Sequence, residues 1–176
     1  MAAPDFDRQE ILRTWRLFRL PGEVLELRIP EAGRFRTISG YFDSPEALAG
    51  AVVGLSDSGF PGIYFTVNLV KPELLARAAN TYSKFAKTTT SDSDIAALHW
   101  LPIDCDAVRP AGISSTDAEH KAAISKAREV RRWLMEDLGW SDAAFVLADS
   151  GNGSHLNARI DLANAPENTA LVKRCL

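Results

Sequence analysis

The stretch that decides the fold runs from residue 99 to residue 106 and has the sequence His99-Trp100-Leu101-Pro102-Ile103-Asp104-Cys105-Asp106. Its apolar part predicts a buried strand, which ends in two acids. Because strand side chains alternate between faces, we expect the Asp104 and Asp106 carboxylates to point the same way, roughly 7 Å apart. The opposite face, with His99, Leu101, Ile103 and Cys105, suits a core: we expect a structural histidine at 99 and a small buried apolar group at 105.

The paired acids are candidate metal ligands. Two like charges at the end of an apolar strand repel each other and are expected to lose hydration, for which a divalent cation is the usual compensation. Two-metal phosphoryl-transfer sites use such a clamp, with ions about 4 Å apart. A turn just after a strand, where Asp is common, is the alternative, and the pair alone does not decide between them.

The composition limits the classes of protein. A chain of 176 residues fits one domain, or one core with a small subdomain. The formal net charge of -3 provides no general basic field, so any contact with nucleic acid must come from local patches. Cys105 and Cys175 form neither a disulfide framework nor a zinc motif, which favours a reducing cytoplasm. We find no signal peptide and no apolar run of membrane-spanning length.

The N-terminal half alternates helices and strands. An apolar stripe predicts a helix from Asp7 to Phe18, and its arginines at 13, 16 and 19 are better explained as a solvated face than as a phosphate track. Ser44 and Pro45 open a second helix as N-cap and first residue. Strands are expected at 24–29, 35–38 and 62–68, and a further helix at 71–80.

The segment 82–94 is polar and long for a loop, so it is either functional or mobile. It contains Lys84, Lys87 and three threonines. These side chains are suited to holding phosphate or a template strand, and an ordinary surface loop explains them equally well.

The C-terminal half continues with a capping box at Thr116 that opens a helix ended by Gly139, with His120 at the surface. A strand at 144–149 leads into a tight turn, in which Asn152-Gly153 favours a two-residue hairpin. The returning strand, 154–162, has one apolar and one polar face. The polar face carries His155, Asn157, Arg159 and Asp161. A helix starts at Pro166 and stops after two turns, which suggests an N-terminal fragment of a longer protein.

Two of these features belong together chemically. One is the Asp-x-Asp strand end, and the other is the turn Ser150-Gly151-Asn152-Gly153, which leads into a strand whose first outward residue is His155. Glycines let backbone N–H groups approach phosphate closely, and a histidine beside them can donate to a triphosphate. Two carboxylates hold the metal ions that neutralise that triphosphate. The combination points to nucleotidyl transfer.

The sequence resembles the archaeo-eukaryotic primase superfamily, most closely its primase-polymerase members from phages, plasmids and related mobile elements. The stretch 101–106 looks like the family's apolar-Asp-x-Asp motif. The stretch 150–156 is similar to its small-x-His motif with the preceding glycine turn, and a capped helix of about twenty residues lies between them. The stretch 64–68 is similar to a strand often found upstream in these relatives.

The resemblance implies an α+β fold, in which a mainly antiparallel catalytic sheet like that of an RNA-recognition motif packs with helices beside an N-terminal α/β unit. We expect one incomplete domain over 1–176, with the α/β unit at 1–80 and the start of the catalytic core at 95–176. Asp104 and Asp106 would bind Mn²⁺ or Mg²⁺ as catalytic residues. His155 would contact the phosphates of the incoming nucleotide, and the turn of Ser150, Gly151, Asn152 and Gly153 would support it.

The implied activity is template-directed synthesis of a primer or DNA strand from nucleoside triphosphates on single-stranded DNA. A downstream helicase domain or replication protein is an implied partner. The family's third motif, an apolar residue followed by a metal-binding Asp, cannot be placed before Leu176, and Asp161 lies too close to His155 to replace it comfortably. We therefore expect weak nucleotide binding without polymerisation.

Two alternatives remain open. One is another metal-dependent phosphotransfer enzyme, such as a nuclease or nucleotidyl cyclase. The other is a non-catalytic domain that binds single-stranded DNA or a replication partner. The four tryptophans offer stacking surfaces for the second, although their spacing favours core packing. They are Trp15, Trp100, Trp133 and Trp140.

Overall fold

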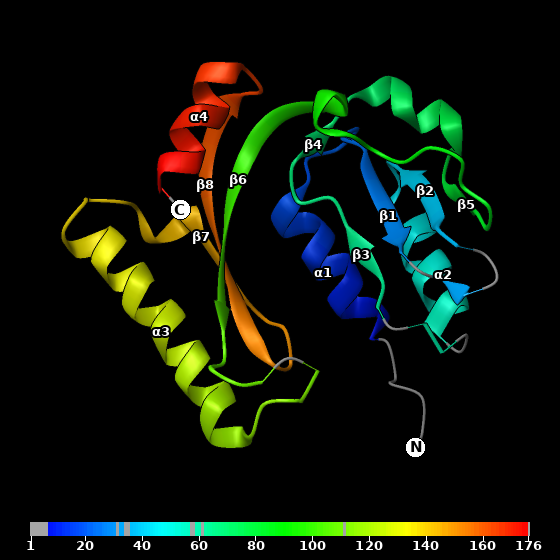
Figure 1. Cartoon of the computed structure of the whole chain (residues 1–176). Helices are drawn as coiled ribbons and strands as arrows, with labels where there is room; N and C mark the ends of the chain where they lie inside the picture. The colour runs from blue at the N-terminus through cyan, green and yellow to red at the C-terminus, as the bar shows by residue number, and fades with distance from the viewer. Residues whose placement is uncertain are drawn as a thin grey trace. The chain divides into compact units, whose positions relative to one another are not determined.

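The computed structural model describes residues 7–30, 32–33, 36–56, 59–60, 62–110 and 112–175. The chain divides into two compact units, Met1–Ala97 and Leu98–Leu176. Helices combine with antiparallel sheets, so the expected α+β class is confirmed (Figure 1). The boundary between the units falls near the start of β6 (Ile95–Asp106), the strand that carries the paired acids.

The first unit begins with α1 (Arg8–Phe18), as its apolar stripe predicted. Asp7 is the N-cap and accepts a hydrogen bond from the backbone N–H of Gln9. The expectation of a solvated arginine face is wrong for Arg19, which is 5% exposed. Its guanidinium donates to the carbonyl oxygens of residues 66, 67 and 68. The charge of Arg19 is therefore compensated by backbone carbonyl oxygens, and not by solvent or by a phosphate group.

The sheet of this unit has the strand order β3-β1-β2-β5. β1 (Leu25–Ile29) and β2 (Ile38–Phe42) pair antiparallel, from Leu25 opposite Phe42 to Ile29 opposite Ile38. Of the strand expected at 35–38, only Ile38 belongs to β2. Residue 35 lies outside the described residues. All five residues of β2 are buried.

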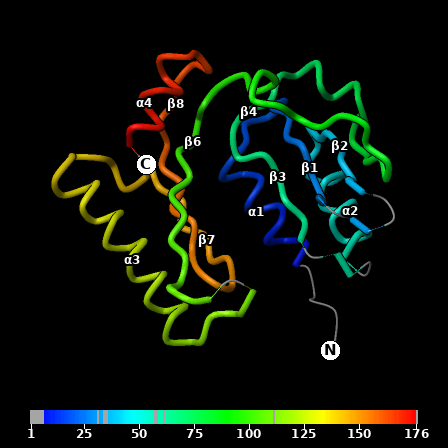
Figure 2. Tube along the Cα trace, in the orientation of Figure 1, coloured from blue at the N-terminus to red at the C-terminus, as the bar shows by residue number. Residues whose placement is uncertain are grey.

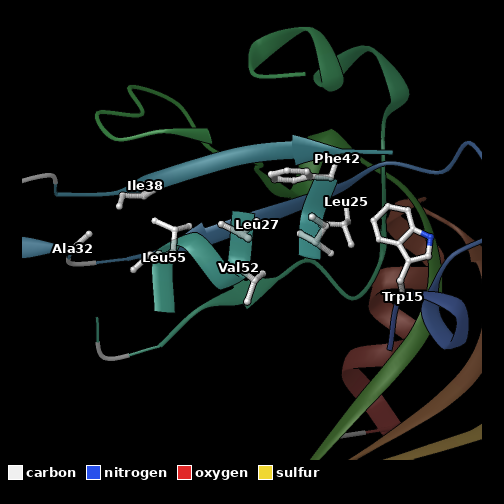
Figure 3. Packing of buried hydrophobic residues seen from close by; sticks show 10 residues of the cluster. Trp15, Leu25, Leu27, Ala32, Ile38, Phe42, Val52 and Leu55 are labelled. Atoms are coloured by element: carbon white, nitrogen blue, oxygen red, sulfur yellow. The ribbon is translucent and has the colours of Figure 1, made fainter. Parts of the chain in front are cut away.

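Helix α2 (Pro45–Ser56) starts where predicted, and the Ser44 hydroxyl oxygen accepts from the Ala47 N–H at 3.3 Å. Figure 3 shows the core of this unit, where side chains of α1, α2, β1 and β2 meet. Trp15, Leu25, Leu27 and Phe42 lie within it. Trp15 is thus a packing residue, as expected.

Two predictions in the middle of the chain are wrong in extent. The strand expected at 62–68 is reduced to β3 (Tyr64–Phe65) and followed by β4 (Leu69–Val70), which pairs with the start of β6. The helix expected at 71–80 is a 3-10 helix, η2 (Pro72–Arg77). The residues that follow η2 pair with the backbone of Tyr41 and do not continue the helix. The Tyr41 N–H donates to the Ala78 carbonyl, and the Asn80 N–H donates to the Tyr41 carbonyl. These tertiary bonds replace those that would have continued a helix.

The expected loop at 82–94 is framed by β5 (Thr81–Ser83), which pairs with β2, and by a second 3-10 helix, η3 (Asp92–Asp94). The segment between them, 84–91, has neither helix nor strand.

The second unit contains β6, α3 (Asp117–Glu136), the short 3-10 helix η4 (Asp142–Ala144), β7 (Phe145–Asp149), β8 (Gly153–Ala163) and α4 (Pro166–Cys175). Its strands lie in the order β6-β8-β7, so β8, the last of the three in the sequence, lies between the other two. This β-α-β-β-α succession is that of an RNA-recognition-motif-like sheet up to its second helix. Figure 2 traces the path of the chain.

One face of this sheet is covered by α3. Cys105 of β6, Leu156 of β8, and Ala127 and Leu134 of α3 form the buried cluster. The expectation of a buried cysteine is confirmed. Leu138 is 53% exposed because the helix ends at Glu136, before Gly139 with its φ of 70°.

No helix among the described residues is long and apolar enough to cross a membrane.

Candidate functional site

The paired acids lie at the end of β6 on the face opposite the α3 cluster. Cys105 between them is buried, whereas Asp104 and Asp106 are exposed, so the predicted common face is confirmed. The side chain of Asp104 is 62% exposed. The expectation that these carboxylates lose hydration is therefore wrong. Repulsion between like charges remains the reason to expect a cation here.

His155 of β8 lies beside the first acid. Its Nε2 is 3.5 Å from Oδ1 of Asp104, and its ring is 50% exposed. The two residues come from different motifs and meet because β8 is the neighbour of β6 in the sheet. The structure thus places an acid and a histidine on one solvent-facing surface, as the two motifs together require.

Gly153 brings the second acid to the same place. A Cβ atom built on Gly153 would lie 2.6 Å from the carbonyl oxygen of Cys105 and 3.3 Å from Oδ1 of Asp106. Since real Cβ atoms do not approach a carbonyl oxygen so closely, this position requires glycine. Asp104, Asp106 and His155 therefore cluster around the point where the start of β8 meets the end of β6.

The hairpin between β7 and β8 differs from the predicted one by a residue. The Ser150 N–H donates to the Gly153 carbonyl at 3.1 Å, and Asp149 pairs with Ser154, so the two-residue loop is Gly151-Asn152. Gly151 has a φ of 80°, a conformation that favours glycine. The tertiary role of Asn152 explains the shift, because its side-chain oxygen accepts from the Ser115 N–H at 3.0 Å.

The turn's backbone donors are engaged within the protein. The Gly151 N–H donates to Oδ1 of Asp149 at 2.7 Å, and the Gly153 N–H donates to the Ser150 hydroxyl oxygen at 3.0 Å. Together with the Ser150 N–H, three donors are therefore not directed at a ligand. In this geometry the turn supports the strand that carries His155 and does not cradle phosphate through these groups.

A contact that the sequence did not predict fixes the turn from outside. His120, in the first turn of α3, lies with its Nε2 2.8 Å from Oδ1 of Asp149. The hydrogen bond from the Gly151 N–H and, second, the contact with His120 lower the pKa of Asp149. The expectation that His120 is merely a surface residue is therefore incomplete. No local pattern signals this pair, since its partners belong to elements that meet only through the fold.

Asp161 does not join the cluster. Its Oδ1 accepts from Nε of Arg159 at 2.7 Å and lies 4.0 Å from Nε2 of His99. The ion pair with Arg159 lowers the pKa of Asp161. Because His99 precedes Asp104 by five strand residues, Asp161 lies roughly 16 Å from the first acid. At this distance Asp161 is too far from Asp104 to share a metal ion with it.

The tryptophans are mostly packing residues, as their spacing indicated. Trp100 is 4% exposed and lies beneath the guanidinium of Arg159 at 5.2 Å, and Trp140 stacks on Phe145. Trp133 is the exception, at 52% exposed.

The donor set determines which metal chemistry is available. Within the described ranges, no group of three or more His, Cys, Asp or Glu side chains is arranged to hold a metal ion. Two carboxylates are too few for a closed protein cage. They do fit Mg²⁺ or Mn²⁺ that is bound jointly with a nucleotide, because such ions take one or two carboxylates and complete their shell with water and phosphate oxygens.

No protein-family model, no curated protein and no solved structure matches this chain. The resemblance to the primase superfamily therefore rests on the motifs at 101–106 and 150–156.

Proposed function

We propose that this chain is the nucleotide-binding, catalytic part of a primase-polymerase, which transfers nucleotides from nucleoside triphosphates to a growing strand. The observation that supports it best is the 3.5 Å approach of His155 to Asp104, beside a glycine that fits directly against the end of β6. Two sequence motifs that separately have ordinary explanations thereby form one exposed surface.

The side chains have distinct roles in this proposal. Asp104 and Asp106 hold the divalent ions together with the triphosphate. Those ions supply neutralisation of the phosphate charge and a lowered pKa for the attacking 3′-hydroxyl. His155 donates a hydrogen bond to a phosphate oxygen and orients the triphosphate. The 3′-hydroxyl releases its proton to solvent as its oxygen bonds to the α-phosphorus, the bond to the bridging oxygen breaks, and pyrophosphate leaves.

The supporting residues act on geometry. The His120–Asp149–Gly151 contacts hold the hairpin from which β8 starts. Gly153 lets that strand approach β6 closely enough for His155 to reach Asp104. A site this open to solvent is consistent with weak binding of nucleotide before a template and primer are present.

Calorimetric titration of a nucleoside triphosphate into the chain, with and without Mn²⁺, tests the proposal. We expect Mn²⁺-dependent binding that is lost in Asp104→Asn/Asp106→Asn. A matched control is Glu136→Gln/Asp137→Asn, which removes two exposed acidic charges from the end of α3 and should bind as the unmodified chain does. Equal binding by the site variant and the control would contradict the proposal. Metal binding that is indifferent to the triphosphate would instead favour a nuclease.

A further inference from the structure

A second site lies in the first unit, at the polar segment 84–91. It is a pocket of about 270 Å³ bordered by β2, η2, the end of β5 and this segment. Its walls combine two cations, several hydroxyl groups and an aromatic ring. The residues that matter here are Tyr41, Arg77, Ser83, Phe85, Lys87 and Thr88.

The floor of the pocket is held firmly in place. Tyr41 is 1% exposed, and its hydroxyl oxygen accepts hydrogen bonds from Nη1 of Arg77 at 3.2 Å and from the Thr90 hydroxyl at 3.3 Å. Glu26, 0% exposed, accepts from the Ser39 hydroxyl, from Arg28 and from the Thr90 N–H. The far end of the polar segment is therefore tied to the sheet, and the pocket exists before any ligand arrives.

The charge of the pocket favours an anion. Arg77 lies with its guanidinium carbon 5.9 Å from the centroid of the Tyr41 ring, and Lys87 adds a second, exposed cation. Asp94 lies 3.6 Å from Arg77 and offsets part of this charge. The carboxylate of Glu26 is paired with Arg28. Two cations beside one partly buried acid, with hydroxyl donors from Ser83 and Thr88, suit one phosphate group.

An exposed ring completes the arrangement. Phe85 is 66% exposed although it is large and apolar, and it lines the same pocket. Its backbone N–H donates to the Ser83 hydroxyl oxygen at 3.3 Å, which restrains the chain at the base of the side chain. A basic pocket bordered by an exposed aromatic ring is the combination that binds single strands, where backbone phosphates meet cations and bases stack on rings.

We propose that this pocket binds single-stranded DNA, with one backbone phosphate held by Arg77 and Lys87 and an adjacent base stacked on Phe85. A free phosphate ion has no ring face to stack on Phe85. The bases of duplex DNA are stacked on one another and do not expose their faces to this side chain. The inference rests on the proposed function only in identifying the strand as a template; the binding itself requires neither metal nor nucleoside triphosphate.

The test is fluorescence anisotropy with a labelled oligothymidylate and the full chain, without nucleotide or divalent metal. Phe85→Ala should weaken binding by about 5- to 150-fold, the range found when a stacking ring is removed. Phe85→Tyr keeps a ring and should retain most of the affinity. The control Leu138→Ala removes another exposed apolar side chain and should have no effect.

The contribution of phosphate is tested by salt dependence. Lys87→Ala should weaken binding and reduce the slope of log affinity against log salt concentration by about 0.7, the value for one phosphate contact on a single strand. Lys173→Ala, an exposed lysine on α4, is the control and should leave the slope unchanged.

Absence of binding by the unmodified chain would overturn the inference, as would equal affinity for the unmodified chain and Phe85→Ala. Full competition by inorganic phosphate at a Phe85-independent site would also overturn it. Because nucleotide and metal are omitted, each of these failures leaves the calorimetric result for Asp104 and Asp106 untouched, so the two proposals can fail separately.

Discussion

Gly153 of β8 lies so close to Cys105 of β6 that an added Cβ atom would be 2.6 Å from the Cys105 carbonyl oxygen. The same atom would lie 3.3 Å from Oδ1 of Asp106. This contact determines how near the two motif-bearing strands come to each other at the candidate site. The requirement for glycine at 153 is therefore steric, since neighbouring backbone occupies the space that a side chain would need.

Gly153→Ala should consequently destabilise the chain and disturb the site. We expect a loss of about 1–3 kcal/mol in the free energy of unfolding, typical of overpacking against atoms that cannot move aside. Urea denaturation measures this loss. Gly50→Ala is the control: Gly50 lies in α2 with open space around its Cα, so alanine should be neutral or stabilise the chain by up to about 1 kcal/mol. Equal effects of the two substitutions would contradict the steric account.

Asp149 should make stability depend on pH at the acidic end. The pKa of Asp149 in the folded chain is lowered, first by the hydrogen bond from the Gly151 N–H and then by His120. Its contribution to the free energy of unfolding is therefore present at pH values above its unfolded-state pKa of about 3.9. This contribution is lost as the pH falls through the lowered pKa that Asp149 has in the folded chain. The side chain is 56% exposed, so we expect only about 0.2–1 kcal/mol.

Unfolding of the unmodified chain and of Asp149→Asn, compared over this range, tests that expectation. Their difference in unfolding free energy should be largest near neutral pH and shrink below about pH 4. A difference that stays constant down to about pH 2 would show that the contacts of Asp149 do not depend on its charge.

The buried carboxylate of Glu26 should be important for the first unit. Glu26→Ala removes the acceptor of the Ser39 hydroxyl and of the Thr90 N–H, together with the ion-pair partner of Arg28, and we expect a cost of roughly 3 kcal/mol in urea denaturation. Glu73→Ala, an exposed glutamate at the start of η2, should change stability by less than about 0.5 kcal/mol. A loss for Glu26→Ala as small as this control would contradict the network described here.

His155 should contribute to nucleotide affinity and little to stability, because its ring is 50% exposed. His155→Ala should weaken Mn²⁺-dependent triphosphate binding by about 10- to 100-fold, the value of a hydrogen bond to a charged group. His155→Gln keeps a side-chain donor and should recover part of the affinity. Unchanged affinity in His155→Ala would exclude phosphate contact by this residue.

The sequence predicted most accurately those features that depend on neighbouring residues. The caps at Ser44 and Thr116 located two helices, an apolar stripe located α1, and the alternation around Cys105 placed both acids on one solvent-facing surface. These signals are local, because a cap or a strand face is set within a few residues.

The features that sequence reasoning missed depend on contacts between distant segments. The helix expected at 71–80 yielded to backbone bonds with Tyr41, and Arg19 became buried because three carbonyls from another segment accept its hydrogen bonds. The His120–Asp149 contact likewise needs α3 and β7 to be side by side. No periodicity in the sequence encodes such encounters.

The central claim is that Asp104 and Asp106 bind divalent ions jointly with a nucleoside triphosphate. Electron paramagnetic resonance of free Mn²⁺, followed during titration of the chain with and without triphosphate, tests this most directly. The account predicts that additional Mn²⁺ is taken up per chain when triphosphate is present and that this uptake is lost in Asp104→Asn/Asp106→Asn. Uptake that is the same in this variant as in the unmodified chain would contradict it.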